Sequence, residues 1–202
     1  MDGLGYWERH AKRYDRSTRL LARPVPRMLE LTVEAVRGRG NVLEVAAGTG
    51  LVTTAIAPVV GSLTATDYSA AMIGELQRRV ATAANVRCER ADLFALPYPD
   101  ATFDAVVAAN VLHLVPDLER ALASLRRVLV PGGILVAPTY LHAETLRARI
   151  LSALLAVTGF PTQRRFRATS LLAALESAGF DAEVETIAGP FPIGFAVTRP
   201  VR

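Results

Sequence analysis

The stretch VLEVAAGTG, residues 42–50, joins an apolar run containing one acid, Glu44, to small residues and two glycines, Gly48 and Gly50. A short apolar run bounded by turn residues predicts a buried strand. Small residues let a ligand approach the backbone, and glycine adopts positive φ angles without a steric penalty. The helix expected next brings unpaired N–H groups and a positive dipole end to the same place. The stretch therefore predicts a turn that binds a polar or anionic group.

Short β-rich runs alternate with helical runs on both sides of this turn, which predicts βαβ units and a mostly parallel sheet. The segment 180–199 reads as two strands joined at Ala188-Gly189-Pro190, a connection short enough only for antiparallel pairing. The expected strands are 41–46, 62–67, 85–90, 103–110, 134–140 and the two within 180–199. The expected helices are 4–21, one ending near Val36, 49–59, 69–83 with Ser69 as N-cap, 117–129, 142–157 and 169–178.

The 202 residues fit one domain with a full core. Within that single domain we expect three parts: an N-terminal helical cap over 1–38, a ligand-binding core over 41–140, and helices with a C-terminal antiparallel hairpin over 141–202. The segment RPVPR, 23–27, is expected to separate two helices, because proline disfavours helix in the residue before it.

Composition excludes several classes of protein. Hydrophobic residues make up 51% and charged residues 21%, which is typical of a soluble globular chain. The single cysteine, Cys88, excludes a disulfide framework and predicts a reducing, cytoplasmic setting. The net charge of +4 comes from scattered arginines, which disfavours nucleic-acid binding. Three scattered histidines and one cysteine lack the spacing of metal ligands, so no metal is predicted.

Two other acids follow expected strands at the same rim as the glycine turn. Asp67 ends the second strand, where a carboxylate accepts hydrogen bonds from two ribose hydroxyls. Asp92 follows the third strand, where its side chain can meet the exocyclic amine of an adenine with Leu93 beside the ring. The three positions together predict an adenosine-binding site.

Two common nucleotide motifs fit the turn less well. A P-loop requires a lysine and then Ser/Thr after its second glycine, and Leu51-Val52 stand there instead. A dinucleotide fingerprint requires a third glycine, and Thr53 occupies that position. Both alternatives are disfavoured by these residues.

The chain resembles the class I S-adenosylmethionine (SAM)-dependent methyltransferases, in the group that includes the ubiquinone/menaquinone-type and related small-molecule enzymes. The matching stretches are VLEVAAGTG, ATDYSAAMI, ADLFALPYPDATFDAVVAANVLHLVPD and LRRVLVPGGILVAPTY, which lie within 42–140. The resemblance implies a Rossmann-like, doubly wound α/β fold with a seven-stranded sheet whose last strand is antiparallel. It also implies SAM as cofactor, S-adenosylhomocysteine as product and a small-molecule acceptor.

By motif match the resemblance implies a set of cofactor-binding residues. The methionine part would be surrounded by Ala46, Ala47, Gly48 and Gly50, with Glu44 supporting the turn or the amino group and Asn110 offering its backbone near the amino group. Asp67 would bind the ribose, Tyr68 and Met72 would lie against the adenine, Asp92 and Leu93 would flank its other edge, and Tyr14 would close over the cofactor. Ala46 replaces the first glycine of the family turn. A methyl group is tolerated there if φ stays negative, so we expect a slightly altered turn that still binds the cofactor.

The candidate catalytic residues are His113, as the base, with Tyr140 and His142; simple packing is the alternative for His113. Apolar and aromatic residues in the variable parts predict a hydrophobic or aromatic acceptor, and the alternative is that they simply cover the sheet. These aromatic residues are Tyr6, Trp7, Tyr140, Phe160, Phe166 and Phe191. Two further hypotheses stay open: a phospholipid or quinone-precursor methyltransferase in peripheral contact with a membrane, and a SAM-binding sensor or partner protein without catalysis.

Overall fold

The computed structural model describes residues 5, 23–157 and 162–201. The strands are β1 (Asn41–Glu44), β2 (Ser62–Asp67), β3 (Val86–Arg90), β4 (Phe103–Val107), β5 (Leu129–Val136), β6 (Thr139–Tyr140), β7 (Phe180–Ile187) and β8 (Ile193–Pro200). The helices are α3 (Val25–Val36), α4 (Leu51–Ile56), α5 (Ala70–Arg79), α6 (Leu118–Val128), α7 (Leu146–Val157) and α8 (Ala168–Ser177), with short 3₁₀ turns η3 (Ala57–Val59) and η4 (Leu93–Ala95). Tyr6, Trp7, Tyr14 and Phe160 lie outside the described residues.

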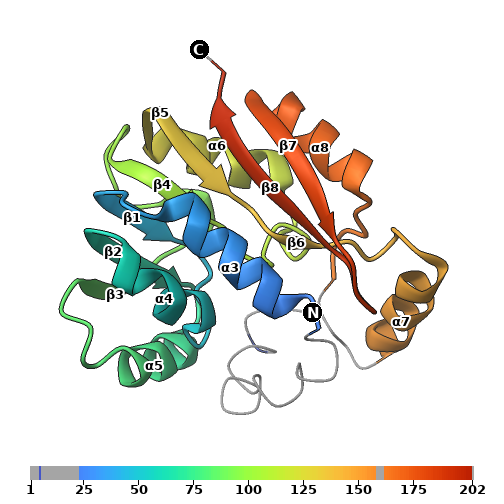
Figure 1. Cartoon of the computed structure of the whole chain (residues 1–202), viewed down its shortest axis with the longest axis horizontal. Coiled ribbons are helices and arrows are strands. Elements are labelled where there is room, and N and C mark those ends of the chain that lie inside the picture. The colour runs from blue at the N-terminus through green and yellow to red at the C-terminus, as the bar shows by residue number, and fades with distance from the viewer. Residues whose placement is uncertain (1–4, 6–22, 158–161, 202) are drawn as a thin grey trace.

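The strands form one twisted sheet with the order β3-β2-β1-β4-β5-β8-β7 (Figure 1). The pairs among β1 to β5 are parallel, and β8 is antiparallel to both β5 and β7. The short strand β6 pairs with β8 through Thr139 and Gly194, beyond the point where β5 pairs through Leu135 and Thr198. The predicted fold class is therefore confirmed, and the expected fifth strand is interrupted, which gives eight strands in seven positions.

Side chains of the central strands alternate between two apolar cores. Val42, Ala105 and Val107 pack in the core that α3 and α4 share, whereas Leu43 and Val106 pack in the core that α6 and α8 share. Figure 1 shows α3 and α4 in front of the sheet and α6 and α8 behind it. Because both faces are covered, the central strands β1 and β4 bury apolar side chains on both sides, whereas the edge strand β3 carries several charged side chains.

Local sequence signals explain most helix starts. The Ser69 hydroxyl accepts a hydrogen bond from the Met72 N–H (3.3 Å), which confirms the predicted N-cap of α5. Asp117 caps α6 by accepting from the Arg120 N–H (3.0 Å). The second expected helix begins earlier than predicted, since α3 starts at Val25 inside RPVPR. Pro24 and Pro26 stand at its first positions, where a helix needs no N–H donor.

A second difference concerns Val130-Pro131-Gly132-Gly133, which was expected to be a turn before the fifth strand. The structure includes these residues in β5, and the register between β4 and β5 shifts across Phe103 and Ala105. Gly132 has φ +80°, which only glycine adopts readily. The segment is therefore a bulge within the strand, because both sides of it still pair with β4.

Candidate functional site

The loop that leaves β1 is a tight turn with three residues in the left-handed region. Ala46, Gly48 and Gly50 have φ angles of +51°, +56° and +88°. The Ala47 N–H donates to the Thr66 carbonyl (2.9 Å), and the Gly50 N–H donates to the Ala47 carbonyl (3.0 Å). The prediction that φ of Ala46 stays negative was wrong. The turn keeps the left-handed geometry and imposes it on alanine, at a cost of about 1–2 kcal/mol.

The two glycines meet different surroundings. A Cβ on Gly50 would lie 2.6 Å from Cδ1 of the buried Leu76, so packing against α5 excludes a side chain there. A Cβ on Gly48 would meet no atom within 4 Å. The space beside Gly48 is therefore left open for something other than protein.

Asp67, at the end of β2, accepts backbone hydrogen bonds with both carboxylate oxygens. The Gly48 N–H donates to Oδ2 (2.9 Å) and the Ser69 N–H donates to Oδ1 (2.8 Å). These bonds fix the carboxylate beside the glycine turn.

Glu44 is 1% exposed at the end of β1. The Thr53 hydroxyl donates to its Oε2 (2.7 Å). Burial and, to a smaller extent, the nearby charge of Asp67 raise the pKa of Glu44 to about 8, against the opposing effect of hydrogen bonds from Thr53. A cationic group placed beside Glu44 would favour its charged form.

These residues line a cavity of about 410 Å³ at the carboxyl ends of β1, β2, β3 and β4. Ten of the eleven described residues that the sequence predicts for the cofactor are among its lining residues: Glu44, Ala46, Ala47, Gly48, Asp67, Tyr68, Met72, Asp92, Leu93 and Asn110. Gly50 does not line the cavity and acts on the backbone of the turn. Tyr14 lies outside the described residues.

Tyr68 lies at an exposed part of the cavity wall, with 51% of its surface exposed. The Arg90 guanidinium lies 5.5 Å from the centre of its ring, and the Arg90 Nε–H donates to the Tyr68 carbonyl (2.9 Å). Nearby, Asp92 accepts from the Phe94 N–H with Oδ1 (2.9 Å). The aromatic ring is thus held by Arg90, which does not line the cavity, and the carboxylate is held by the backbone of Phe94.

Several lining residues were not predicted from the sequence, among them Met28, Leu51, Phe94, Leu114 and Val115. Met28 comes from α3, which carries no nucleotide-binding motif, and reaches the cavity through packing. The amide nitrogen of Asn110 lies 3.6 Å from the sulfur of Met28, and its Oδ1 is buried without a partner.

The three candidate catalytic residues come together with Phe191 in an aromatic cluster (His113, Tyr140, His142 and Phe191). The His142 ring centre lies 5.0 Å from that of His113 and 5.1 Å from that of Phe191, and the Tyr140 centre lies 5.9 Å from that of His113. None of the four is among the described residues that line the cavity. The sequence placed them at one rim but did not reveal their burial.

The ring nitrogens of this cluster are incompletely paired. His113 Nδ1 and His142 Nε2 are buried without a hydrogen-bond partner, whereas His142 Nδ1 lies 3.1 Å from the Ser152 hydroxyl. Burial lowers the pKa of His113 to about 3 and that of His142 to about 4, so both rings are neutral near pH 7. Burial also raises the pKa of Tyr140 to about 12. Buried unpaired nitrogens are uncommon in native proteins.

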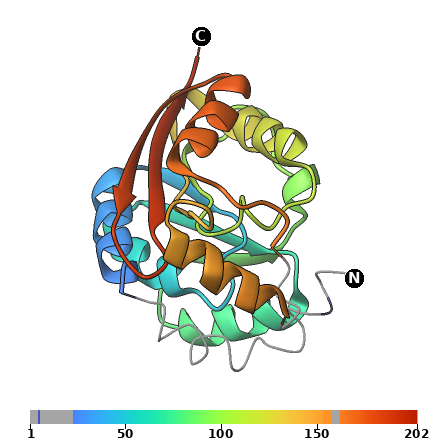
Figure 2. The ribbon, with the colours of Figure 1, turned by 90° about the vertical axis from the view of Figure 1, so that its right-hand side faces the viewer.

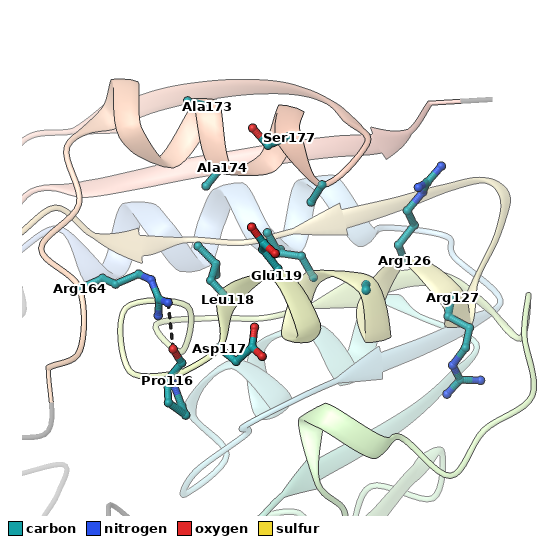
Figure 3. A pocket seen from close by; sticks show the side chains of 13 residues that line it. Pro116, Asp117, Leu118, Glu119, Arg126, Arg127, Arg164, Ala173, Ala174 and Ser177 are labelled. Atoms are coloured by element: carbon teal, nitrogen blue, oxygen red, sulfur yellow. Dashed lines mark hydrogen bonds between the residues drawn. The ribbon is translucent and has the colours of Figure 1, made fainter.

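A larger hollow of about 1140 Å³ opens between α6 and α8, on the face behind the sheet (Figure 3). Its arginines are already engaged with backbone carbonyls: Arg164 with Val115 and Pro116, and Arg126 with Val201. No buried unpaired polar atom of the described residues lies in its lining. We therefore place the functional site at the smaller cavity. Within the described part of the chain no group of three or more His, Cys, Asp or Glu side chains is arranged to hold a metal.

Comparison with known proteins agrees with this geometry. Residues 43–137 match a family model described as a methyltransferase domain. A malonyl-[acyl-carrier protein] O-methyltransferase of Halorhodospira halophila is 37% identical over 139 residues, covering 67% of this chain and 46% of the relative. A demethylmenaquinone methyltransferase of Thermus thermophilus is 38% identical over 138 residues, covering 62% of this chain and 60% of the relative.

The chain thus spans about half the length of the curated relatives it matches. Among solved structures, the complex of DhpI with SAH superposes with a TM-score of 0.79 at 27% identity, covering 98% of this chain and 95% of that one. The matched motifs, the strand order and this superposition together identify the chain as a member of the class I SAM-dependent methyltransferase family.

Proposed function

We propose that this protein transfers a methyl group from SAM to a small hydrophobic or aromatic acceptor. The observation that carries the proposal is the cavity itself, in which the glycine turn, Asp67, Asp92 and Asn110 converge from the ends of four adjacent strands. The convergence of these residues supports the binding of one elongated ligand that has an adenosine end and a charged amino-acid end. The relatives named as methyltransferases support the same reaction class.

The adenosine end would lie between β2 and β3. Asp67, already oriented by two backbone N–H groups, would accept hydrogen bonds from the ribose hydroxyls. Tyr68 and Met72 would lie against one side of the adenine, with Leu93 near its other edge. Asp92 has Oδ1 engaged by the backbone, and its Oδ2 would accept from the exocyclic amine.

The methionine end would lie over the turn from Ala46 to Gly48, where the space beside Gly48 is open. Asn110 Oδ1 has no partner and would accept from the amino group. Glu44, protonated at neutral pH in the ligand-free chain because its pKa is about 8, would lose its proton when a cationic ligand enters. The fit rests on these incompletely paired groups, which a cation with hydrogen-bond donors would satisfy.

SAM supplies a methyl group on a sulfonium, which leaves as a neutral thioether. The chain would contribute orientation, holding the acceptor atom in line with the methyl group; positioning of this kind supplies up to about 7–11 kcal/mol in well-oriented systems. The loop after β4 brings Leu114 and Val115 to the cavity, and this apolar wall supports an apolar acceptor. His113, Tyr140 and His142 would contact the acceptor beyond this wall. With a pKa of about 3, His113 is a weak base, so an acceptor that is nucleophilic by itself fits best.

A SAM-binding protein without catalysis is a second candidate. It is supported by the lining of the cavity, which among the described residues holds no histidine, lysine or cysteine. Under this reading the aromatic cluster would only pack beside the site.

Calorimetric titration of the full chain with SAM and with S-adenosylhomocysteine tests the site, with NADH as a negative control. Conversion of SAM is then followed by mass spectrometry with phenol, quinol, thiol, amine and carboxylate acceptors. Binding of SAM together with a methylated product supports the proposal. Binding without product from any acceptor favours the sensor, and no binding of either compound rejects both.

A further inference from the structure

Helix α7 (Leu146–Val157) has a buried inner face and an exposed apolar outer face. Its inner face is covered: Ala148 is fully buried and Ser152 is 3% exposed. Its outer face carries Leu146, Ile150 and Leu154, which are 71%, 55% and 61% exposed. A spacing of four residues places these three side chains in one row along the helix. They are half of the six exposed large apolar side chains in the described part of the chain.

The two views place this helix at the periphery of the molecule. It is the outermost element on the right in Figure 1 and faces the viewer in Figure 2, where no other element lies in front of it. The inner face is tied to the body of the protein, since the Ser152 hydroxyl lies 3.1 Å from His142 Nδ1. The apolar row therefore points away from the sheet.

Positive charge flanks the apolar row. At 100° per residue, Arg147 and Arg149 fall on either side of it, and both are exposed. The segment 143–167 has five arginines and a single acid, Glu144, so its net charge is +4. This is the same as the net charge of the whole chain. The rest of the chain is therefore neutral overall.

Two further arginines lie beside the start of α7. The Ala143 N–H donates to the Phe166 carbonyl (3.0 Å), which brings the exposed Arg165 and Arg167 next to this helix. The Glu144 carboxylate accepts from the Ala168 N–H (2.8 Å), so the one acid in the segment is engaged with the backbone. Four of the five arginines in this segment thus lie on α7 or beside its start, whereas Arg164 lies in the hollow between α6 and α8.

We propose that the outer face of α7 is a docking surface for an anionic lipid bilayer. A row of Leu and Ile side chains with arginines on both sides is the pattern of a helix that lies in the membrane interface, because the apolar side chains enter the acyl boundary while the guanidinium groups reach the lipid phosphates. Anionic headgroups also complement the local charge. No helix in the described residues is long and apolar enough to cross a bilayer, and lying on the surface requires none. The inference goes beyond methyl transfer and does not depend on it.

Co-sedimentation of the full chain with vesicles tests this surface. Vesicles of phosphatidylglycerol mixed with phosphatidylcholine are compared with vesicles of phosphatidylcholine alone, at low and at high salt. We expect the wild type to bind the anionic vesicles preferentially and salt to weaken the binding. The double variant Arg147→Gln/Arg149→Gln should bind about tenfold more weakly or worse, since each basic residue near such a surface contributes about fivefold. A loss of at least the same size is expected for the triple variant Leu146→Ser/Ile150→Ser/Leu154→Ser, because it removes the apolar side chains that enter the acyl boundary.

Matched control variants lie elsewhere on the surface. Arg37→Gln/Arg199→Gln removes two exposed arginines, and Val201→Ser removes an exposed apolar side chain. Both should bind as the wild type does, and circular dichroism should show that every variant is folded. Failure of the wild type to bind, or equal losses in the control variants, overturns the proposal. A dimer in light scattering that only the α7 triple variant dissociates, without vesicle binding, shows instead that a second copy covers this face and also overturns it.

Discussion

The glycine turn and the aromatic cluster lie at the same edge of the sheet, yet they differ in how far their polar groups are hydrogen-bonded. In the turn, both oxygens of Asp67 accept backbone N–H groups and Glu44 accepts from Thr53. In the aromatic cluster, His113 Nδ1 and His142 Nε2 are buried without partners. The turn is therefore organised before any ligand arrives, whereas the cluster has hydrogen-bonding capacity that the protein itself leaves unmet.

This contrast matches a division between a cofactor and an acceptor. A common cofactor is bound most tightly by groups already held in place, because little ordering remains to be done. Unpaired buried nitrogens reduce stability, and such sites are expected where function requires them. The predictions that follow test whether the two regions differ in the way that this division requires.

The largest expected effect concerns the pH dependence of stability through Glu44. Its pKa is about 8 in the folded chain and 4.5 ordinarily, so the folded state retains a proton that the unfolded state releases. Stability should therefore fall as pH rises from about 4.5 to about 8 and level off above that. Glu44→Gln keeps an acceptor for Thr53 but cannot ionise, so it should become more stable than wild type by several kcal/mol at pH 8, on the scale of about 1.4 kcal/mol per pKa unit.

Urea unfolding of both proteins between pH 5 and pH 9 measures this difference. Parallel stability profiles would show that Glu44 is already charged in the ligand-free protein. Asp104→Asn is the matched control, since Asp104 accepts from the Asn41 N–H (2.8 Å) at the other end of β1 and has no part in the cavity.

The second prediction concerns binding at the cofactor end of the cavity. Asp67→Ala removes the proposed ribose acceptor and should weaken SAM binding by roughly 1.5–3 kcal/mol, the scale for hydrogen bonds to a charged group. Calorimetry at constant pH gives the difference. Asp104→Ala should leave SAM affinity unchanged, and a wild-type affinity in Asp67→Ala would place the ribose elsewhere.

Much of the turn region was predictable because its signals are local. The apolar run, the glycines and the acid at the end of β2 are close in sequence, and parallel topology brings the ends of neighbouring strands to one edge. The family resemblance supplied the remaining cofactor residues, and ten of the predicted residues line the cavity. Met28 was missed because only the packing of α3 brings it to Asn110, and no periodicity marks such a contact.

The errors have identifiable physical causes. Ala46 carries a methyl group, which favours negative φ, but the hydrogen bonds around the turn impose +51°. The Gly132-Gly133 pair predicts a turn as readily as a bulge, and only pairing with β4 distinguishes the two. The aromatic cluster joins residues from three separate parts of the chain, so its members were predicted at one rim without the burial that lowers the pKa of its histidines.

The third prediction compares the two regions by replacing one polar side chain in each. Thr53→Val removes the donor to buried Glu44 and should lower the free energy of unfolding by about 1–3 kcal/mol. His113→Leu removes an unpaired ring nitrogen, so the ligand-free protein should be unchanged within about 1 kcal/mol or become more stable. Urea unfolding at pH 7 measures both. A loss in His113→Leu as large as that in Thr53→Val would mean that the aromatic cluster is as well satisfied as the turn.

The smallest effect tests the strain that the turn retains. Ala46→Gly removes the strain of an alanine in the left-handed region, which is about 1–2 kcal/mol. Because glycine also increases the conformational freedom of the unfolded chain, the net gain in stability should be about 0.5–1 kcal/mol. Ala47 is not in the left-handed region, so Ala47→Gly should instead lose about 0.5–1 kcal/mol. Thermal unfolding of the two variants gives opposite signs if backbone geometry is the cause. If both variants lose stability, the methyl group of Ala46 contributes through packing, and the turn would then be held by side-chain contacts as well as by the backbone.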